Sequence, residues 1–222
     1  MERQVLYHAI AVVAMGMAVV GQAGAVERPN ILLVTTDQQR TDTLSCYGSS
    51  FAHSPHLDHF AAQGVQFLDA YASAPVCAPS RTSLLLGVHV PNHLILENGM
   101  NFHSDVHEPF SDILRDDVGY TTALIGKAGF TPIPESLALH DSWLYTSKFS
   151  SLRSSSTPAA GFLETVIVNR SMQWITKYSK PPSDTNSTAK PWFLHVSMLS
   201  PHGPNTLPRD WVPPVSRAEV LS

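Results

Sequence analysis

The segment Cys77-Ala78-Pro79-Ser80-Arg81 places a cysteine and an arginine about one helical turn apart. Pro79 suits the first turn of a helix, and Gly87 suits the position just after its last residue. Cys77 would then lie at the helix N-terminus, where backbone N–H groups favour negative charge. Because Arg81 follows four residues later, its side chain can reach the same place. The segment predicts an oxyanion pocket with a reactive cysteine at its mouth.

A structural interpretation of this cysteine stands beside the catalytic one. The chain has two cysteines, Cys46 and Cys77, so it is not a disulfide scaffold. In an oxidising compartment the two could form a disulfide, and a buried structural thiol is equally simple. Composition alone favours this structural interpretation.

Three more candidate residues follow short apolar runs that are typical of buried parallel strands. Asp37, Lys127 and His202 each come just after one of these runs. In parallel sheets ligands bind beyond the carboxyl ends of the strands, so we expect the three side chains to share one site. The runs are Ile31–Val34, Thr121–Ile125 and Trp192–Met198.

Helical patterns separate these strand candidates, which predicts an α/β fold with a mainly parallel central sheet flanked by helices. In the first helix Leu57 and Phe60 are expected to face inward. The segments 131–160 and 180–189 are expected to be loops or insertions. The helical patterns cover residues 54–64, 77–86, 110–117 and 163–178.

The remaining histidines lack the H-E-x-x-H spacing of a helical zinc motif. We expect them to be solvated or packed in the core. His195 lies within the third apolar run, where it should be packed or turned to solvent.

Composition limits the classes of partner. The 222 residues carry 14 Lys+Arg and 18 Asp+Glu, for a net charge of −4. This balance argues against nucleic acid as a partner, because no basic surplus is available for a phosphate backbone. Hydrophobic residues make up 43% of the chain, which is enough for one sizeable core.

The first 25 residues have the layout of a secretory signal peptide. Arg3 precedes an apolar stretch from Ala9 to Val20, and Ala23-Gly24-Ala25 supplies a cleavage site. The alternative is a membrane anchor, for which the apolar stretch is short. After cleavage, residues 26–222 would form a single domain that is not an integral membrane protein. Two glycosylation sequons, at Asn169 and Asn186, are compatible with the secretory pathway.

Two motifs resemble the signatures of the sulfatase family. The segment 77–81, followed by Leu85 and Gly87, is similar to the signature C-x-P-S-R-x-x-x-L-x-G. Residues 119–127, Gly-Tyr-Thr-Thr-Ala-Leu-Ile-Gly-Lys, resemble the second signature at the expected distance downstream.

Two further segments extend this resemblance over residues 29 to about 211. Residues 29–38 are similar to the opening strand and metal-binding turn of the family. Residues 191–194 and Pro201-His202 resemble its later strand and its substrate histidine.

The resemblance implies an alkaline-phosphatase-like α/β fold and a secreted or lysosomal sulfuric ester hydrolase. Its substrate would be an aryl sulfate or a sulfated glycan. It also implies that a formylglycine-generating enzyme converts Cys77 to formylglycine. A hydrated aldehyde there offers one oxygen to attack sulfur and a second to expel sulfate afterwards.

The resemblance implies a role for each of the other site residues as well. Asp37, Gln38 and the modified Cys77 would hold a Ca²⁺ ion, which prefers oxygen ligands. Arg81, Lys127 and His202 would balance charge on the sulfate and on the leaving oxygen.

The sequence departs from the family pattern in two ways. Gly129 stands where many sulfatases have a histidine, and the stretch after Lys127 resembles the arylsulfatase K branch, which tolerates that loss. The chain is also about half as long as typical members, so we expect a truncated N-terminal half without the remaining metal ligands. Two alternatives therefore stay open: an inactive fragment with only an anion-binding pocket, and a phosphate or phosphonate ester hydrolase on the same fold.

Overall fold

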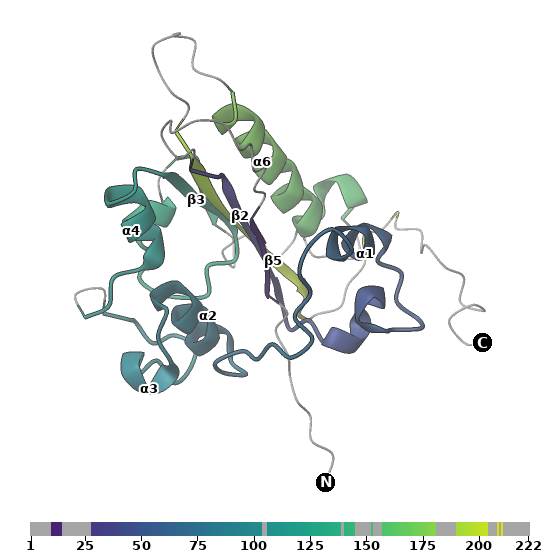
Figure 1. The fold of residues 1–222 in the computed structure, drawn as a ribbon, viewed down its shortest axis with the longest axis horizontal. Coiled ribbons are helices and arrows are strands. Elements are labelled where there is room, and N and C mark those ends of the chain that lie inside the picture. The colour runs from purple at the N-terminus through teal and green to yellow at the C-terminus, as the bar shows by residue number, and fades with distance from the viewer. Residues whose placement is uncertain are drawn as a thin grey trace, which may run out of the picture.

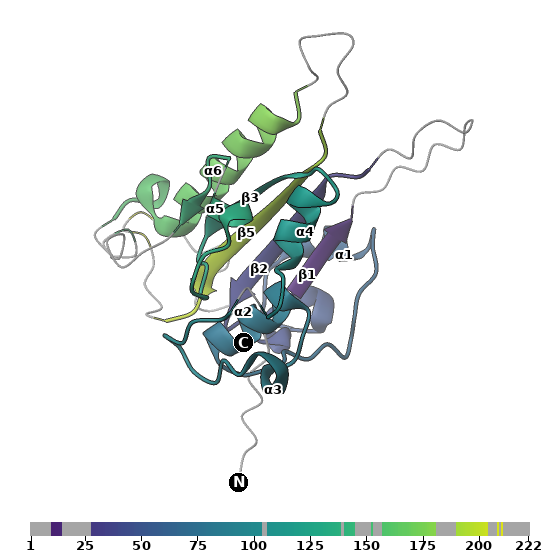
Figure 2. The ribbon, with the colours of Figure 1, turned by 90° about the vertical axis from the view of Figure 1, so that its left-hand side faces the viewer.

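A mainly parallel β-sheet forms the centre of the molecule (Figures 1 and 2). A computed structural model of the chain describes residues 10–14, 28–103, 106–138, 140–144, 152, 157–180, 190–203, 208 and 210. Within these residues the strand order is β1-β2-β5-β3-β4. The strands are β1 (Ile10–Ala14), β2 (Ile31–Asp37), β3 (Thr121–Gly126), β4 (Trp143–Leu144) and β5 (Trp192–Pro201).

The strand register confirms the predicted parallel arrangement. β2 and β3 flank β5, and both are parallel to it, with Leu33 and Leu124 in register with His195. β4 continues the parallel order, and β1 pairs antiparallel with β2 at the other edge. The carboxyl ends of β2, β3 and β5 therefore lie at the same edge of the sheet, as the sequence predicts.

Helices cover both faces of the sheet (Figure 2). The long helix α6 lies on one face, while α2 and α4 lie on the other. The helices are α1 (Pro55–Ala61), α2 (Cys77–Leu86), α3 (Val90–His93), α4 (Phe110–Asp116), α5 (Glu135–Ala138) and α6 (Leu163–Tyr178), with short 3₁₀ turns η1 (Thr41–Thr43), η2 (Ser45–Tyr47) and η4 (Ala159–Gly161).

Side-chain alternation along the strands divides the core into two clusters. Leu33, Leu124 and Phe193 pack toward α2 and α4. Their neighbours in sequence pack on the opposite face against α6, where Trp174 and Trp192 are buried as well. Because both faces of the central strands are covered, their sequences read as nearly continuous apolar runs.

The prediction for α1 is correct in its position and wrong in its packing. Leu57 and Phe60 are exposed, by 49% and 42%. Polar contacts hold this helix instead: Ser45 of η2 and Ser54, which precedes α1, donate hydrogen bonds to Asp58. Leu57 and Phe60 stay about half open to solvent, so the hydrophobic pattern of this short helix does not mark a buried face.

The expectation of loops over 131–160 is wrong in part, because α5 and β4 lie within that segment. Leu137 of α5 is 1% exposed and joins the core beside β3. Four residues are too few for a recognisable period, so the pattern could not reveal this helix. The segment 181–189 lies outside the described residues.

Strand β1 lies within the segment that the sequence predicts to be a signal peptide. Cleavage after Ala25 would remove this strand and leave β2 at the edge of the sheet, so the signal peptide stays a prediction. Among the described residues, no helix has the length and apolar character needed to cross a bilayer.

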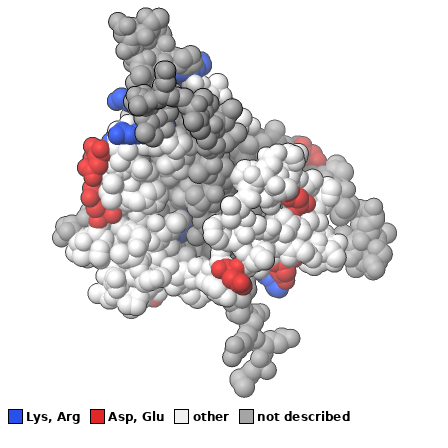
Figure 3. Space-filling view, viewed as in Figure 1, with Lys and Arg blue, Asp and Glu red and all other residues white. Residues whose placement is uncertain are grey.

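Charged side chains are few on the face shown in Figure 3: one acidic group lies at its left edge over α4, and other acidic side chains are scattered over its lower and right-hand parts. This sparse pattern reflects the composition, in which charged residues are 14% of the chain.

Candidate active site

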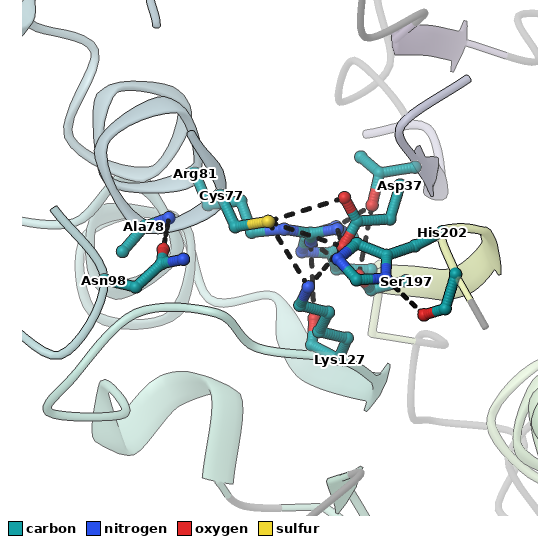
Figure 4. Close-up of polar contacts among 11 residues, drawn as sticks. Asp37, Cys77, Ala78, Arg81, Asn98, Lys127, Ser197 and His202 are labelled. Carbon is teal, nitrogen blue, oxygen red and sulfur yellow. Dashed lines mark hydrogen bonds and ion pairs between the residues drawn. The ribbon is translucent and has the colours of Figure 1, made fainter. Parts of the chain in front are cut away.

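Side chains from three strand ends and one helix start meet in a single cluster (Figure 4). Asp37 is the last residue of β2, Lys127 directly follows β3, and His202 directly follows β5. Cys77 is the first residue of α2 and points at this edge of the sheet. The structure thus brings together the residues that the sequence predicts to share a site.

The Cys77 thiol lies between the carboxylate of Asp37 and the ammonium of Lys127. Its Sγ atom donates to the Asp37 carboxylate, at 3.5 Å from Oδ1 and 3.7 Å from Oδ2. Lys127 donates from Nζ to Sγ at 3.4 Å and also forms an ion pair with Asp37. Cys46 and Cys77 are both free, so the disulfide alternative is not formed.

Arg81 brings a second positive charge to the same carboxylate from inside the protein. Its NH2 atom lies 3.6 Å from Oδ2 of Asp37, and both side chains are buried. Burial lowers the pKa of the Arg81 guanidinium below its ordinary value, while the Asp37 carboxylate opposes that shift. The Nε atom of Arg81 is buried without a hydrogen-bond partner among the described residues. It is therefore a buried donor whose hydrogen-bonding capacity is unused among these residues.

A glycine at the end of β3 allows Lys127 to enter the cluster. Gly126 has a φ of +115°, and a Cβ there would lie far inside contact distance of the Ser197 carbonyl. The next residue, Lys127, donates its backbone N–H to that same carbonyl at 3.0 Å. The close approach of the two strands thus directs the lysine side chain beyond the sheet edge.

Asn98 is a site residue that the sequence did not reveal. Its Oδ1 atom accepts the backbone N–H of Ala78 at 2.9 Å, in the first turn of α2 (Figure 4). The N-cap residue of this helix, Val76, makes no side-chain cap. Asn98 therefore satisfies from a distant loop a donor that helix N-termini leave unpaired. A lone asparagine outside any periodic segment carries no sequence signal of that role.

The cluster has a donor set that suits a cation. Ligand atoms of Asp37, Cys77 and His202 lie within 4.8 Å of one another. Asp37 is fully buried and supplies hard carboxylate oxygens, the donors that Ca²⁺ prefers. Gln38, the other predicted ligand, has an exposed side chain and a φ of +58°. His202 bonds through Nδ1 to the Gly203 carbonyl at 2.6 Å.

A cavity of about 390 Å³ opens from this cluster. Cys77 and Lys127 line it, and Met100, Phe130 and Ile133 add apolar side chains to the lining. Gly129 also lines the cavity, where a Cβ would lie 3.1 Å from the buried Nε of Arg81. The Arg81 side chain therefore packs in the space that a side chain at position 129 would need, and glycine there permits this packing.

The cluster combines the groups that an anion site with a nucleophile would need. Position 77 is at a helix N-terminus and lies beside two cations and a carboxylate that can hold a metal ion. Cationic side chains that are already in position, such as Arg81 and Lys127, can stabilise the negative charge that develops on a transferred sulfuryl or phosphoryl group.

Curated relatives match about half of the chain. It is 35% identical over 101 residues to an N-acetylglucosamine-6-O-sulfatase of Bacteroides thetaiotaomicron, covering 46% of this chain and 18% of that protein. It is 34% identical over 127 residues to an arylsulfatase of Clostridium perfringens, covering 53% and 25%. It is 37% identical over 120 residues to the steryl-sulfatase of Mus musculus, covering 47% and 18%. The chain therefore spans about a quarter or less of these relatives.

Solved structures share the fold. One, described as a complex with its substrate D-glucosamine-2-N,6-O-disulfate, superposes with a TM-score of 0.64 at 26% identity, over 84% of this chain and 36% of that one. A phosphonate monoester hydrolase of Agrobacterium radiobacter gives 0.63 at 23% identity, over 82% and 43%. The fold is thus the expected alkaline-phosphatase-like α/β fold. The family model for sulfatases matches residues 29–219, and the chain belongs to the sulfatase family.

Proposed function

We propose that this chain carries the nucleophile half of a sulfuric ester hydrolase active site. The observation that carries the proposal is the contact of Cys77 with both Asp37 and Lys127 at the helix N-terminus. The sulfatase signature at residues 77–81 and the family match support it. The substrate would be an aryl sulfate or a sulfated sugar, in line with the names of the relatives.

The proposed nucleophile is an oxygen of formylglycine hydrate, formed from Cys77 by a formylglycine-generating enzyme. In the unmodified chain, Sγ stands in for that oxygen. That oxygen would lose its proton to a nearby base and attack the sulfur of the ester, and the S–O bond to the substrate alcohol would break as the alcohol takes a proton from a nearby donor. The second hydroxyl of the hydrate then loses its proton and expels sulfate, which regenerates the aldehyde.

The charged residues would act on the sulfate and on the leaving oxygen. The unpartnered Nε of Arg81 and the ammonium of Lys127 would bind sulfate oxygens. His202, with a ring nitrogen within 4.8 Å of the Cys77 Sγ, would donate a proton to the leaving alcohol. A Ca²⁺ ion, held by Asp37, Gln38 and the modified Cys77, would supply positive charge for the sulfate group.

Mass spectrometry and sulfate release test this proposal together. We expect the peptide containing Cys77, from protein made in a eukaryotic secretory pathway, to have the mass of the aldehyde instead of the thiol. We expect that protein to release sulfate from an aryl sulfate or a sulfated glucosamine, and to lose this activity on chelation of divalent cations.

Cys46→Ala is the matched control for Cys77→Ala, because both remove a free thiol. Cys77→Ala should abolish sulfate release, and Cys46→Ala should leave it unchanged. An unmodified thiol at Cys77, or turnover that survives Cys77→Ala, would contradict the proposal.

A phosphonate or phosphate ester hydrolase is the second candidate, because a solved phosphonate monoester hydrolase has the same fold. Parallel assays of sulfate, phosphate and phosphonate esters of one phenol separate the two functions. Binding of sulfate without any turnover would instead indicate an inactive, anion-binding member of the family.

We also propose that the protein enters the secretory pathway and functions there or in the lysosome. The support is the signal-peptide layout of residues 1–25 and the exposed position of the Asn169 sequon on α6. The second sequon, at Asn186, lies outside the described residues. N-terminal sequencing of the exported protein should begin at Val26, and an N-terminus at Met1 would exclude cleavage.

A further inference from the structure

A row of polar side chains lies buried behind the active site, on the sheet face that packs against α2. Because side chains alternate along a strand, Thr35 and Asp37 of β2 share this face with His195 and Ser197 of β5. Thr35 and Ser197 are also register partners on adjacent strands. His195 and Thr35 are each 4% exposed and Ser197 is fully buried. Polar groups this deep need hydrogen-bond partners.

These side chains form a continuous chain of hydrogen bonds that ends at Arg81. The Nε2 atom of His195 lies 3.0 Å from Oγ1 of Thr35. Thr35 donates from Oγ1 to Oγ of Ser197 at 3.2 Å. Arg81 donates from NH1 to that same Oγ at 2.7 Å.

The direction of this series of hydrogen bonds follows from the donors of Arg81 and from the bond that Thr35 donates to Ser197. A guanidinium can only donate, so Ser197 accepts from Arg81. Thr35 has one hydroxyl proton, which it gives to Ser197, so it must accept from His195. The imidazole therefore carries its proton on Nε2.

The charge state of His195 agrees with that direction. Burial first, and then the positive charge of Arg81, lower the pKa of His195 to about 3. The ring is therefore neutral at any physiological pH and has a single N–H to donate. That N–H is directed at Thr35.

The other polar contacts given for the Arg81 guanidinium are long. Its ion pair with Asp37 is long, at 3.6 Å, and its bond from NH1 to the Lys127 carbonyl is 3.4 Å. The bond to Ser197, at 2.7 Å, is shorter than both of these contacts. Ser197 thus fixes the plane of the guanidinium, and with it the direction in which the unpartnered Nε points.

We propose that His195 is a positioning residue for Arg81, acting through Thr35 and Ser197. Because the His195 N–H donates to Thr35, the Thr35 hydroxyl proton is directed at Ser197. The Ser197 oxygen then has a lone pair directed at the Arg81 guanidinium. Arg81 is then held ready to bind an anion before the anion arrives. The role in turnover rests on the proposed function, whereas the hydrogen-bond chain itself can be tested without substrate.

Two variants separate the hydrogen bond from packing. His195→Phe fills a similar volume without a donor, and His195→Gln keeps a neutral N–H donor. His93→Phe is the matched control. His93 is also a buried histidine bonded to a serine, Ser83, but neither residue takes part in the hydrogen bonds that link His195 to Arg81.

NMR spectroscopy of the 222-residue protein gives the direct test. We expect ¹⁵N shifts of the His195 ring that identify the neutral Nε2–H tautomer. We expect His195→Phe to shift the Arg81 side-chain resonances and to speed exchange of its guanidinium protons. His195→Gln should restore both, and His93→Phe should leave both unchanged. The Nδ1–H tautomer in the wild-type protein, or unchanged Arg81 resonances in a folded His195→Phe, would overturn the proposal.

Kinetics supply the functional test with sulfate ester as substrate. We expect His195→Phe to lower kcat/KM by about three- to tenfold, the size of one neutral hydrogen bond, with rescue by His195→Gln. Equal loss in both variants would point to packing alone and would contradict a positioning role. A wild-type protein without turnover would contradict the proposed function, while the NMR result would still decide this proposal. If His195→Phe does not fold, two measurements remain. The Nε2–H tautomer in the wild-type protein and wild-type-like Arg81 resonances in His195→Gln would support the proposal, and the opposite results would overturn it.

Discussion

A single hydrogen bond from outside an element can cap the start of a helix, and Asn98 does so at α2. It accepts the Ala78 N–H and also lines the cavity at Cys77. We expect Asn98→Ala to lower the free energy of unfolding by about 1 kcal/mol, as loss of a helix cap does, and to weaken sulfate binding. Urea unfolding and calorimetric titration with inorganic sulfate measure the two effects.

Asn98→Asp keeps the acceptor and should retain most of that stability. Asn101→Ala, an exposed change on the same loop, is the control and should alter neither quantity. Equal effects of Asn98→Ala and Asn101→Ala would contradict the capping role.

The buried imidazole of His195 predicts a dependence of stability on pH. An unfolded histidine has a pKa near 6.5, whereas the pKa of His195 in the folded protein is about 3. Between these values the unfolded chain binds a proton that the folded chain does not. The stability that His195 contributes is therefore complete above about pH 6.5 and is lost as the pH falls toward 3.

His195→Gln, which cannot titrate, should reduce the slope of unfolding free energy against pH in that window. The largest reduction is one proton, or about 1.4 kcal/mol per pH unit. Urea unfolding at several pH values measures it, with exposed His59→Gln as control. Equal slopes for His195→Gln and the wild-type protein would show that the imidazole titrates normally.

The sequence identifies those site residues that a local signal marks. Cys77 and Arg81 lie in a helix-start motif, and Asp37, Lys127 and His202 follow apolar strands. Their chemical roles remain proposals, although the structure brings their side chains together.

Other site residues carry no local signal. Thr35, His195 and Ser197 lie inside buried strands, where the sequence shows residue types but not which strands are neighbours. Their contacts depend on the pairing of β2 with β5, about 160 residues apart.

At the scale of elements, the strand junction at Gly126 should be the least tolerant position near the site. A Cβ there would collide with the Ser197 carbonyl oxygen and come within 2.9 Å of its carbon, on a backbone with positive φ. We expect Gly126→Ala to destabilise the fold by about 1–3 kcal/mol, as overpacking does, and to displace Lys127. Thermal unfolding and sulfate binding measure these effects.

Gly64→Ala is the matched control, since a Cβ there meets only the Phe60 carbonyl oxygen at 3.8 Å. It should change the melting temperature little. A Gly126→Ala protein as stable as Gly64→Ala would show that β3 and β5 can separate without cost.

Elements are predicted well where their pattern is long or buried on one side. Helix α6 begins and ends as expected, and β2, β3 and β5 begin as expected but end three, one and three residues beyond their predicted runs. The pattern of α1 misleads because an amphipathic sequence shows which face is apolar but not whether anything covers it. β4 and α5 are too short to leave a period.

At the scale of the whole molecule, apolar exposure is concentrated in one stretch of the chain. Large exposed apolar side chains recur along residues 51–76, around α1 and the loop that leads to α2. Soluble monomers rarely expose extended apolar surface, so the 222-residue chain alone should bind hydrophobic dyes and self-associate. These side chains are Phe51, Leu57, Phe60, Val65, Phe67, Leu68, Tyr71 and Val76.

One pair of valines allows a matched test of this expectation. Val65 is 82% exposed within this stretch, and Val106 is 65% exposed outside it. A lysine at either position costs little folding energy, because neither side chain is buried, but only Val65→Lys places a charge among the exposed apolar groups. We expect Val65→Lys to reduce dye fluorescence and the associated fraction in sedimentation velocity, with Val106→Lys matching the wild-type chain. If the two variants behave alike, association arises from net charge or from another surface.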